Sequence, residues 1–239
     1  MKRWKKILLG ILVGIVVILL GSIFYLRTQT YSASEQAQSS AEQANVTNDW
    51  LYFPVKNQNN PAIIFYPGAL VDPTSYSIWA EAVAEAGYSV YIMKMPLDLA
   101  VLSPNSAKKV LAKDANRSYI VGGHSLGGVM ASRFAEEHSK NLKGVFFLAS
   151  YPDEKGSLEK LDIPVLSITG SNDHVLNQTS YQEAKNYLPK DTDYKKITGG
   201  NHAGFGDYGK QKGDGKSEIN NQNQQVAADL IDWLETIKD

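Results

Sequence analysis

The 239-residue chain contains no cysteine. Disulfide bonds, thiolate zinc sites and a cysteine nucleophile are therefore all excluded. Any covalent catalysis must use another side chain.

The chain also lacks a basic stripe of the kind that binds phosphate backbones. Its net charge is -1, and five of its basic residues precede the first acidic residue, Glu35. The segment from Glu35 onward carries a net negative charge. Nucleic acid is therefore not an expected partner, because such binding rests on clustered lysine and arginine.

Residues 7–26 form an almost unbroken apolar run, with Ser22 its only clearly polar member. About 20 helical residues span about 30 Å, the hydrocarbon thickness of a bilayer. The basic residues Lys2, Arg3, Lys5 and Lys6 precede the run, whereas only Arg27 directly follows it. The positive-inside rule therefore predicts that residues 1–27 are a single-pass cell-membrane anchor, with the remainder on the extracytoplasmic side.

A cleaved signal sequence is the alternative interpretation of this N-terminus. Its apolar core is usually about 7–15 residues, shorter than the run seen here. The small residues Ser32, Ala33 and Ser34 keep cleavage and secretion possible. Residues 28–48 are rich in Gln, Ser, Ala and Glu, so they are predicted to form a flexible polar linker.

Residues 49–239 alternate between strand-like and helix-like apolar patterns. Strands followed by helices in turn predict one domain with a mostly parallel central sheet and helices on both faces. The expected strands are residues 51–55, 62–66, 89–93, 119–122, 145–149, 165–169 and 194–197, and the expected helices are residues 74–86, 107–112, 126–138, 181–188 and 226–237.

The most informative motif is G-x-S-x-G, formed by Gly123, Ser125 and Gly127. It stands between an expected strand and an expected helix, which is the context of a nucleophile elbow. The turn brings strand and helix so close that the positions two before and two after the serine have no room for a Cβ. This pattern predicts that Ser125 is a nucleophile.

A serine hydroxyl needs a base, and the base needs a carboxylate to orient it. Of the four histidines, His202 stands in a glycine-rich loop after the last expected strand, where it can reach the elbow; His124 is expected to point away from Ser125. Asp173, just after the strand at 165–169, is favoured as the acid over Asp153. Along the chain the nucleophile then comes first, the acid second and the base third, which is the order that accompanies a G-x-S-x-G elbow.

Stabilising the oxyanion of a tetrahedral intermediate requires backbone N–H donors. One is expected from Leu126, directly after the nucleophile. The other is expected from the loop Pro67-Gly68-Ala69-Leu70, with the N–H of Ala69 favoured over that of Leu70.

Together these residues resemble the α/β-hydrolase superfamily, closest to small bacterial hydrolases of the dienelactone-hydrolase-like and lipase-like branch. The late loop Asn201-His202-Ala203-Gly204-Phe205-Gly206 is similar to theirs, as are the glycines around Tyr208 and Asp214. The resemblance implies the α/β-hydrolase fold, the triad Ser125, Asp173 and His202, and no cofactor. Pro67 stands where many relatives have histidine, and the dienelactone substrate is not implied because the chain lacks their cysteine.

The leading hypothesis is a carboxylesterase-like serine hydrolase that cleaves an ester or related acyl bond of a small molecule through an acyl-enzyme on Ser125. An amide- or thioester-cleaving enzyme of the same fold is the near alternative, and an inactive binding domain of this fold is the alternative from another class. Only about 15 residues separate the strands at 145–149 and 165–169, so a minimal lid or none is expected.

Overall fold

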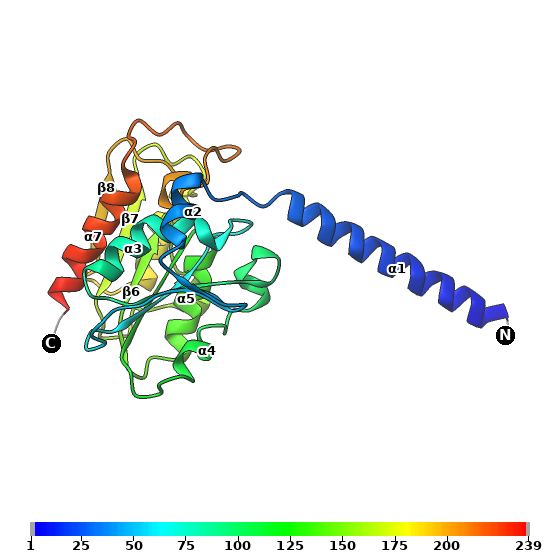
Figure 1. The fold of residues 1–239 in the computed structure, drawn as a ribbon, viewed down its shortest axis with the longest axis horizontal. Helices are drawn as coiled ribbons and strands as arrows, with labels where there is room; N and C mark the ends of the chain where they lie inside the picture. Colours follow the sequence, from blue (N-terminus) through cyan, green and yellow to red (C-terminus); the bar gives the residue numbers. More distant parts are fainter. Residues whose placement is uncertain (1–2, 238–239) are drawn as a thin grey trace. The chain divides into compact units, whose positions relative to one another are not determined.

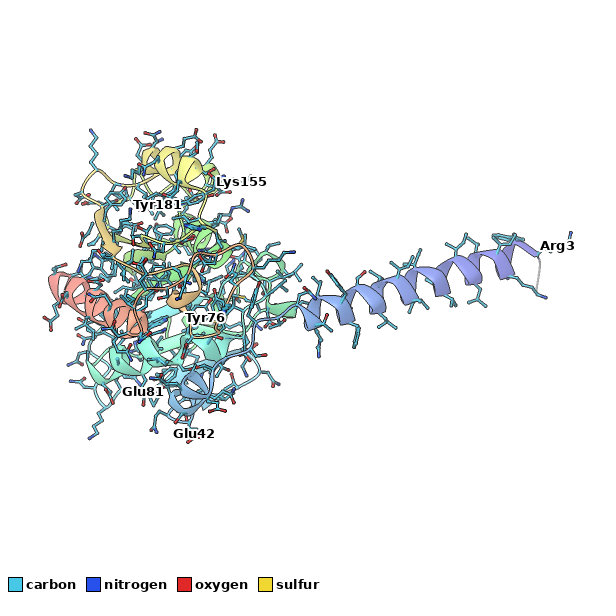
Figure 2. The ribbon with its side chains drawn as sticks, turned by 90° about the horizontal axis from the view of Figure 1, so that it is seen from above. Arg3, Glu42, Tyr76, Glu81, Lys155 and Tyr181 are labelled. Atoms are coloured by element: carbon cyan, nitrogen blue, oxygen red, sulfur yellow. The ribbon has the colours of Figure 1, made fainter. Side chains whose placement is uncertain are left out.

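The computed structural model describes residues 3–237 and separates into two compact units, Met1–Thr30 and Tyr31–Asp239. The first unit is the single helix α1 (Arg3–Thr28), none of whose described residues is buried. Its side chains project outward along its whole length (Figure 2). A mean hydropathy of 3.0 over 18 residues makes this helix apolar enough to cross a membrane, a test that a signal sequence also passes.

The second unit is built on one eight-stranded sheet (Figure 1). The strand order is β1-β2-β4-β3-β5-β6-β7-β8; β2 is antiparallel to both β1 and β4, and all the other pairs are parallel. This confirms the predicted α/β-hydrolase fold with a mostly parallel sheet. The strands are β1 (Asn45–Val46), β2 (Trp50–Phe53), β3 (Ala62–Tyr66), β4 (Val90–Met93), β5 (Tyr119–His124), β6 (Leu142–Leu148), β7 (Val165–Gly170) and β8 (Asp193–Ile197).

Helices cover both faces of this sheet because its central strands are apolar on both sides. All five residues of β3 are buried, which is typical of a strand in a parallel sheet. One core packs beneath α3 (Ser77–Glu85) and α7 (Gln222–Thr236), and the other lies beneath α4 (Lys108–Leu111) and α5 (Leu126–Glu137). One further α-helix, α6 (Gln178–Glu183), follows β7.

Short 3₁₀ helices form many of the connections between these elements. They are η1 (Pro73–Tyr76), η2 (Pro96–Asp98), η3 (Ala100–Leu102), η4 (Glu154–Gly156), η5 (Ala184–Tyr187) and η6 (Ala203–Phe205). Only η4 occurs between β6 and β7, which agrees with the expected absence of a large lid.

The predicted linker at residues 28–48 differs from the structure from Tyr31 onward. Tyr31 bridges to Val71, and α2 (Glu35–Ala41) packs on α3 with Ala37 fully buried. Strand β1 then pairs with the sheet. A polar composition did not prevent folding, because a few small side chains and backbone hydrogen bonds are enough to attach this segment to a domain that is already large.

Candidate active site

Ser125 occupies a strained turn between β5 and α5. Its backbone angles are φ 52° and ψ −126°, in a region that non-glycine residues rarely adopt. A Cβ at Gly123 would lie 2.5 Å from the backbone carbon of Gly127, and a Cβ at Gly127 would lie 2.1 Å from the Tyr66 carbonyl oxygen. The sharp elbow and its two obligatory glycines are therefore present as predicted.

A second serine supports the elbow from the end of β6. The Ser150 hydroxyl donates to the Ser125 carbonyl oxygen at 2.6 Å, and it fills the space that a Cβ at Gly128 would need. Ser150 itself is buried, whereas Ser125 remains partly exposed. Ser150 thus supports the backbone of the elbow while Ser125 stays accessible.

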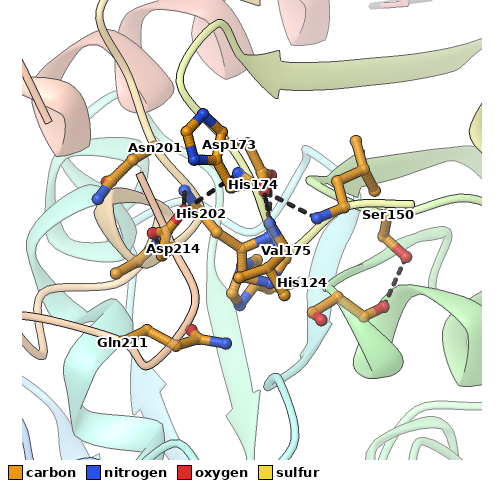
Figure 3. Close-up of polar contacts among 12 residues, drawn as sticks. His124, Ser150, Asp173, His174, Val175, Asn201, His202, Gln211 and Asp214 are labelled. Carbon is orange, nitrogen blue, oxygen red and sulfur yellow. Dashed lines mark hydrogen bonds and ion pairs between the residues drawn. The ribbon is translucent and has the colours of Figure 1, made fainter. Parts of the chain in front are cut away.

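Asp173 and His202 form a buried pair (Figure 3). The distance from His202 Nδ1 to Asp173 Oδ2 is 2.9 Å, and the side chains are 2% and 0% exposed. The other carboxylate oxygen accepts the N–H groups of Val175 and Leu176, at 2.9 and 2.8 Å. Because an ionised carboxylate only accepts, Nδ1 of His202 donates to it and the lone pair of a neutral imidazole lies on Nε2.

The Nε2 atom of His202 has no hydrogen-bond partner among the described residues. The structure thus brings Asp173 and His202 together but makes no hydrogen bond between His202 and Ser125. In unliganded sites such bonds are often long and shorten only when substrate binds.

Asp214 holds the loop that carries His202, a role that the sequence did not indicate. Its carboxylate accepts the N–H of His202 at 3.2 Å and that of Ala203 at 2.8 Å, and also bonds the N–H of Gly215 at 2.8 Å (Figure 3). From α7, the Gln222 amide bonds both the N–H and the carbonyl of Asn201, at 3.0 and 2.8 Å. The loop that carries His202 is thus fixed through its backbone, which no side-chain motif reveals. The carboxylate of Asp214 between two glycines was the only signal in the sequence.

The two expected oxyanion donors remain available. Leu126 opens α5, so its N–H has no partner within the helix. The N–H of Leu70 is already bonded to the Asp98 carbonyl at 2.8 Å, whereas no acceptor among the described residues takes the N–H of Ala69. Between the two candidates in this loop, the geometry favours Ala69.

The rival acid Asp153 is engaged elsewhere. It forms an ion pair with Arg133 and accepts the N–H of Gly156 at 3.1 Å. The hydrogen bonds from Arg133 lower the pKa of Asp153. His138 lies at the end of α5 and His174 is exposed, so neither replaces His202.

His124 was expected to point away from Ser125, and the structure places its ring against that of His202. It is buried, with its ring centroid 4.5 Å from that of His202 and its Nδ1 atom 2.9 Å from the Tyr76 hydroxyl. Burial, with a contribution from nearby His202, holds the pKa of His124 well below its usual value. A neutral imidazole therefore lies beside the His202 ring, a proximity that adjacency to Ser125 alone could not reveal.

A cavity of about 620 Å³ lies on another side of the late loop. Its walls include Asn201, Gly204 and Asn223 but not Ser125. This cavity therefore does not reach Ser125. Among the described residues, no group of three or more His, Cys, Asp or Glu side chains is arranged to hold a metal ion.

The fold and the elbow define an α/β-hydrolase, and comparison with known proteins agrees. Residues 62–226 match the alpha/beta hydrolase family, and the chain belongs to it. No curated protein is significantly similar in sequence.

Solved structures share the fold at low identity. A predicted CIB-like hydrolase from Thermoplasma acidophilum superposes with a TM-score of 0.61 at 15% identity, over 81% of this chain and 96% of that one. A dienelactone hydrolase from Anabaena variabilis gives 0.59 at 15%, over 80% and 92%. The esterase domain of a Rhodothermus marinus protein gives 0.58 at 12%, over 78% and 92%.

Proposed function

We propose that this chain is a serine hydrolase that cleaves a carboxylic ester or a related acyl bond of a small molecule through an acyl-enzyme on Ser125. One observation carries the proposal: the buried Asp173–His202 pair, whose Nε2 atom is unpartnered among the described residues, accompanies a partly exposed serine on a strained elbow. Nε2 of His124 also lacks a partner among the described residues, so the carboxylate on Nδ1 is what distinguishes His202 as the base.

The chemistry begins when His202 Nε2 accepts the Ser125 hydroxyl proton as Oγ bonds to the substrate carbonyl carbon. The carbonyl oxygen becomes an oxyanion that the N–H groups of Leu126 and Ala69 stabilise. Asp173 stabilises the resulting imidazolium without taking its proton. These donors and charges are fixed before substrate arrives, so little reorganisation is needed.

The intermediate collapses by breaking the bond to the leaving group, which takes the proton from His202. Water then transfers a proton to His202 as its oxygen attacks the acyl carbon. Breaking the bond to Oγ releases the acid, and the proton returns to Ser125. The same steps would cleave a thioester or an amide, so they do not distinguish an alcohol from a thiol or an amine as the leaving group.

The short connection between β6 and β7 favours short or accessible acyl groups. Residues 149–164 include only η4 as regular structure, which leaves little material for a cap over Ser125. Esterases and a monoacylglycerol lipase are among the proteins that share the fold, which fits acyl-bond chemistry without specifying a substrate.

We also propose that α1 remains attached as a membrane anchor, with the hydrolase unit on the extracytoplasmic side. The basic residues that precede the apolar run favour this orientation. Retention is favoured over cleavage near Ala33 because Tyr31 and Ser34 are used by the fold: the Tyr31 N–H donates to the Leu70 carbonyl at 2.7 Å, and the Ser34 N–H donates to the Asp207 carbonyl at 2.8 Å.

A fluorophosphonate probe tests the proposal directly. The full chain should be labelled once, at Ser125, and should hydrolyse nitrophenyl acetate or butyrate. Ser125→Ala should abolish labelling and most hydrolysis, while Ser139→Ala, at an exposed serine beyond the end of α5, serves as a matched serine control that keeps both. An unlabelled but folded wild-type protein would instead support an inactive binding domain.

A further inference from the structure

His124 is the residue of the elbow that the proposed chemistry leaves unexplained. It precedes Ser125 directly in the chain and is only 1% exposed. Its ring lies against His202 from the late loop and is bonded to Tyr76 from η1. A single imidazole therefore contacts the two segments that flank the nucleophile.

The hydrogen bonds around Tyr76 form a chain that ends at the oxyanion loop. The Gly68 N–H donates to the Tyr76 hydroxyl oxygen at 2.9 Å, and that hydroxyl lies 2.9 Å from His124 Nδ1. Tyr76 is fully buried, and burial raises its pKa far above the usual value, so it stays protonated. Its one proton is directed to Nδ1, and the proton of neutral His124 is then on Nε2.

The hydrogen bonds from Gly68 through Tyr76 to His124 fix the backbone directly before Ala69. Gly68 directly precedes Ala69, and its carbonyl accepts the N–H of Val71 at 3.4 Å. A Cβ at Gly68 would lie 2.8 Å from His124 Nδ1 and 3.2 Å from the Tyr76 hydroxyl, so the loop rests tightly on both side chains. Gly68 is held at its N–H and its carbonyl, and the following N–H, that of Ala69, has no acceptor among the described residues.

The opposite side of His124 supports the base. Its ring centroid lies 4.5 Å from His202, 5.9 Å from Phe205 and 6.5 Å from Tyr208. The titratable groups that face it are therefore His202, Tyr76 and Tyr208. Because His124 stays neutral in this apolar setting, the proton that His202 gains during the reaction meets no second imidazolium.

We propose that His124 and Tyr76 are positioning residues that couple the oxyanion loop to the His202 loop across the Ser125 elbow. This inference rests on the proposed serine-hydrolase function and adds two residues that touch neither substrate nor the reacting atoms. They act by fixing the Ala69 N–H and the His202 ring relative to the nucleophile. Such a role affects the transition state, where the oxyanion forms, more than it affects substrate binding.

The first test is Tyr76→Phe in the full-length, detergent-solubilised protein with nitrophenyl butyrate as substrate. Losing the hydroxyl leaves the Gly68 N–H and His124 Nδ1 without their partner. We expect kcat to fall about 10- to 100-fold, as for a small misplacement of a catalytic donor, while KM changes by less than about threefold. Tyr119→Phe is the matched control, because it removes another buried hydroxyl, bonded to the His138 carbonyl at the opposite end of β5, and should leave kcat unchanged.

Rescue separates positioning from simple packing. In His124→Asn the amide can place an acceptor near the former Nδ1 position but loses the ring that packs against His202, so kcat should fall less than in His124→Leu, which should lose at least as much as Tyr76→Phe. The kcat of the double variant Tyr76→Phe/His124→Leu should be little lower than that of either single variant, because both substitutions break the same series of hydrogen bonds.

Three results would overturn the inference. They are an unchanged kcat in Tyr76→Phe, an equal loss in Tyr119→Phe, or full additivity of the two losses. Failure of the parent proposal looks different: hydrolysis would then survive Ser125→Ala. If Tyr76→Phe folds poorly, the contrast between His124→Asn and His124→Leu decides, and equal activity of those two variants refutes the coupling.

Discussion

Asp173→Asn is the most discriminating single change in this site, because the two carboxylate oxygens have separate roles. Oδ1 accepts the N–H groups of Val175 and Leu176, and an amide oxygen can continue to do so. Oδ2 faces His202 Nδ1 at 2.9 Å, where the variant would place an NH₂ group. The fold should therefore survive while the histidine is forced to accept at Nδ1 and carry its proton on Nε2.

A histidine with its proton on Nε2 cannot accept the proton of Ser125. In the trypsin-type triad the equivalent change lowers kcat about 10⁴-fold, which corresponds to about 5 kcal/mol of transition-state stabilisation. We expect a loss of that order for nitrophenyl butyrate hydrolysis, with a melting temperature close to wild type. Such a loss without unfolding would separate the catalytic role of Asp173 from its role in capping the turn.

Asp153→Asn is the matched control. That residue also follows a sheet strand, but it pairs with Arg133 at a site where both side chains are 35% exposed. Activity should be unchanged, and the free energy of unfolding should fall by no more than about 1 kcal/mol, as for a partly exposed ion pair. A steep loss in Asp153→Asn with an active Asp173→Asn would refute the assignment of the acid.

Four further outcomes are expected. Ser125→Ala should lower hydrolysis by several orders of magnitude at an unchanged melting temperature; unchanged activity in pure protein would reject the mechanism. Gly127→Ala should cost about 3 kcal/mol in chemical denaturation, because the new Cβ would lie 2.1 Å from the Tyr66 oxygen and 2.3 Å from the Pro67 oxygen; wild-type stability would contradict the elbow geometry. Since the pKa of His124 is lowered on folding, its contribution to stability should be complete above about pH 6.5 and decline below it by up to about 1.4 kcal/mol per pH unit. The free energy of unfolding, measured by denaturation at several pH values, should therefore depend less on pH in His124→Asn than in the wild type. An identical pH dependence would argue against a neutral buried ring. Protease added to intact protoplasts should release a soluble hydrolase fragment, whereas protection until lysis would reverse the proposed orientation.

The centre of the sheet was predictable from sequence because strands such as β3, β4 and β5 are buried on both faces. Such strands appear as continuous apolar runs, and the expected range 62–66 coincides with β3. The elbow was predictable for a related reason: steric exclusion at Gly123 and Gly127 leaves a fixed spacing in the sequence.

The supports of the site were harder to predict, because they depend on contacts between distant segments. Asp214 bonds backbone N–H groups, which have no sequence signature. The partners of His124 could not be predicted, because its position next to Ser125 does not indicate a hydrogen bond to Tyr76, 48 residues earlier. Tyr31 and Ser34 were assigned to a linker because their segment has few apolar residues, although backbone hydrogen bonds attach both to the domain.

The attachment of residues 31–34 determines how this protein should be expressed without its apolar helix. Tyr31 bonds Leu70 and Asp72 in the loop that follows β3, and Ser34 bonds both the backbone and the carboxylate of Asp207 near His202. A recombinant fragment could begin at residue 49, where the composition changes, or at residue 62, where the family match starts. Either fragment would lack the hydrogen bonds that Tyr31 and Ser34 make to the loop after β3 and to Asp207. A soluble fragment for crystallisation or screening should therefore begin no later than Tyr31.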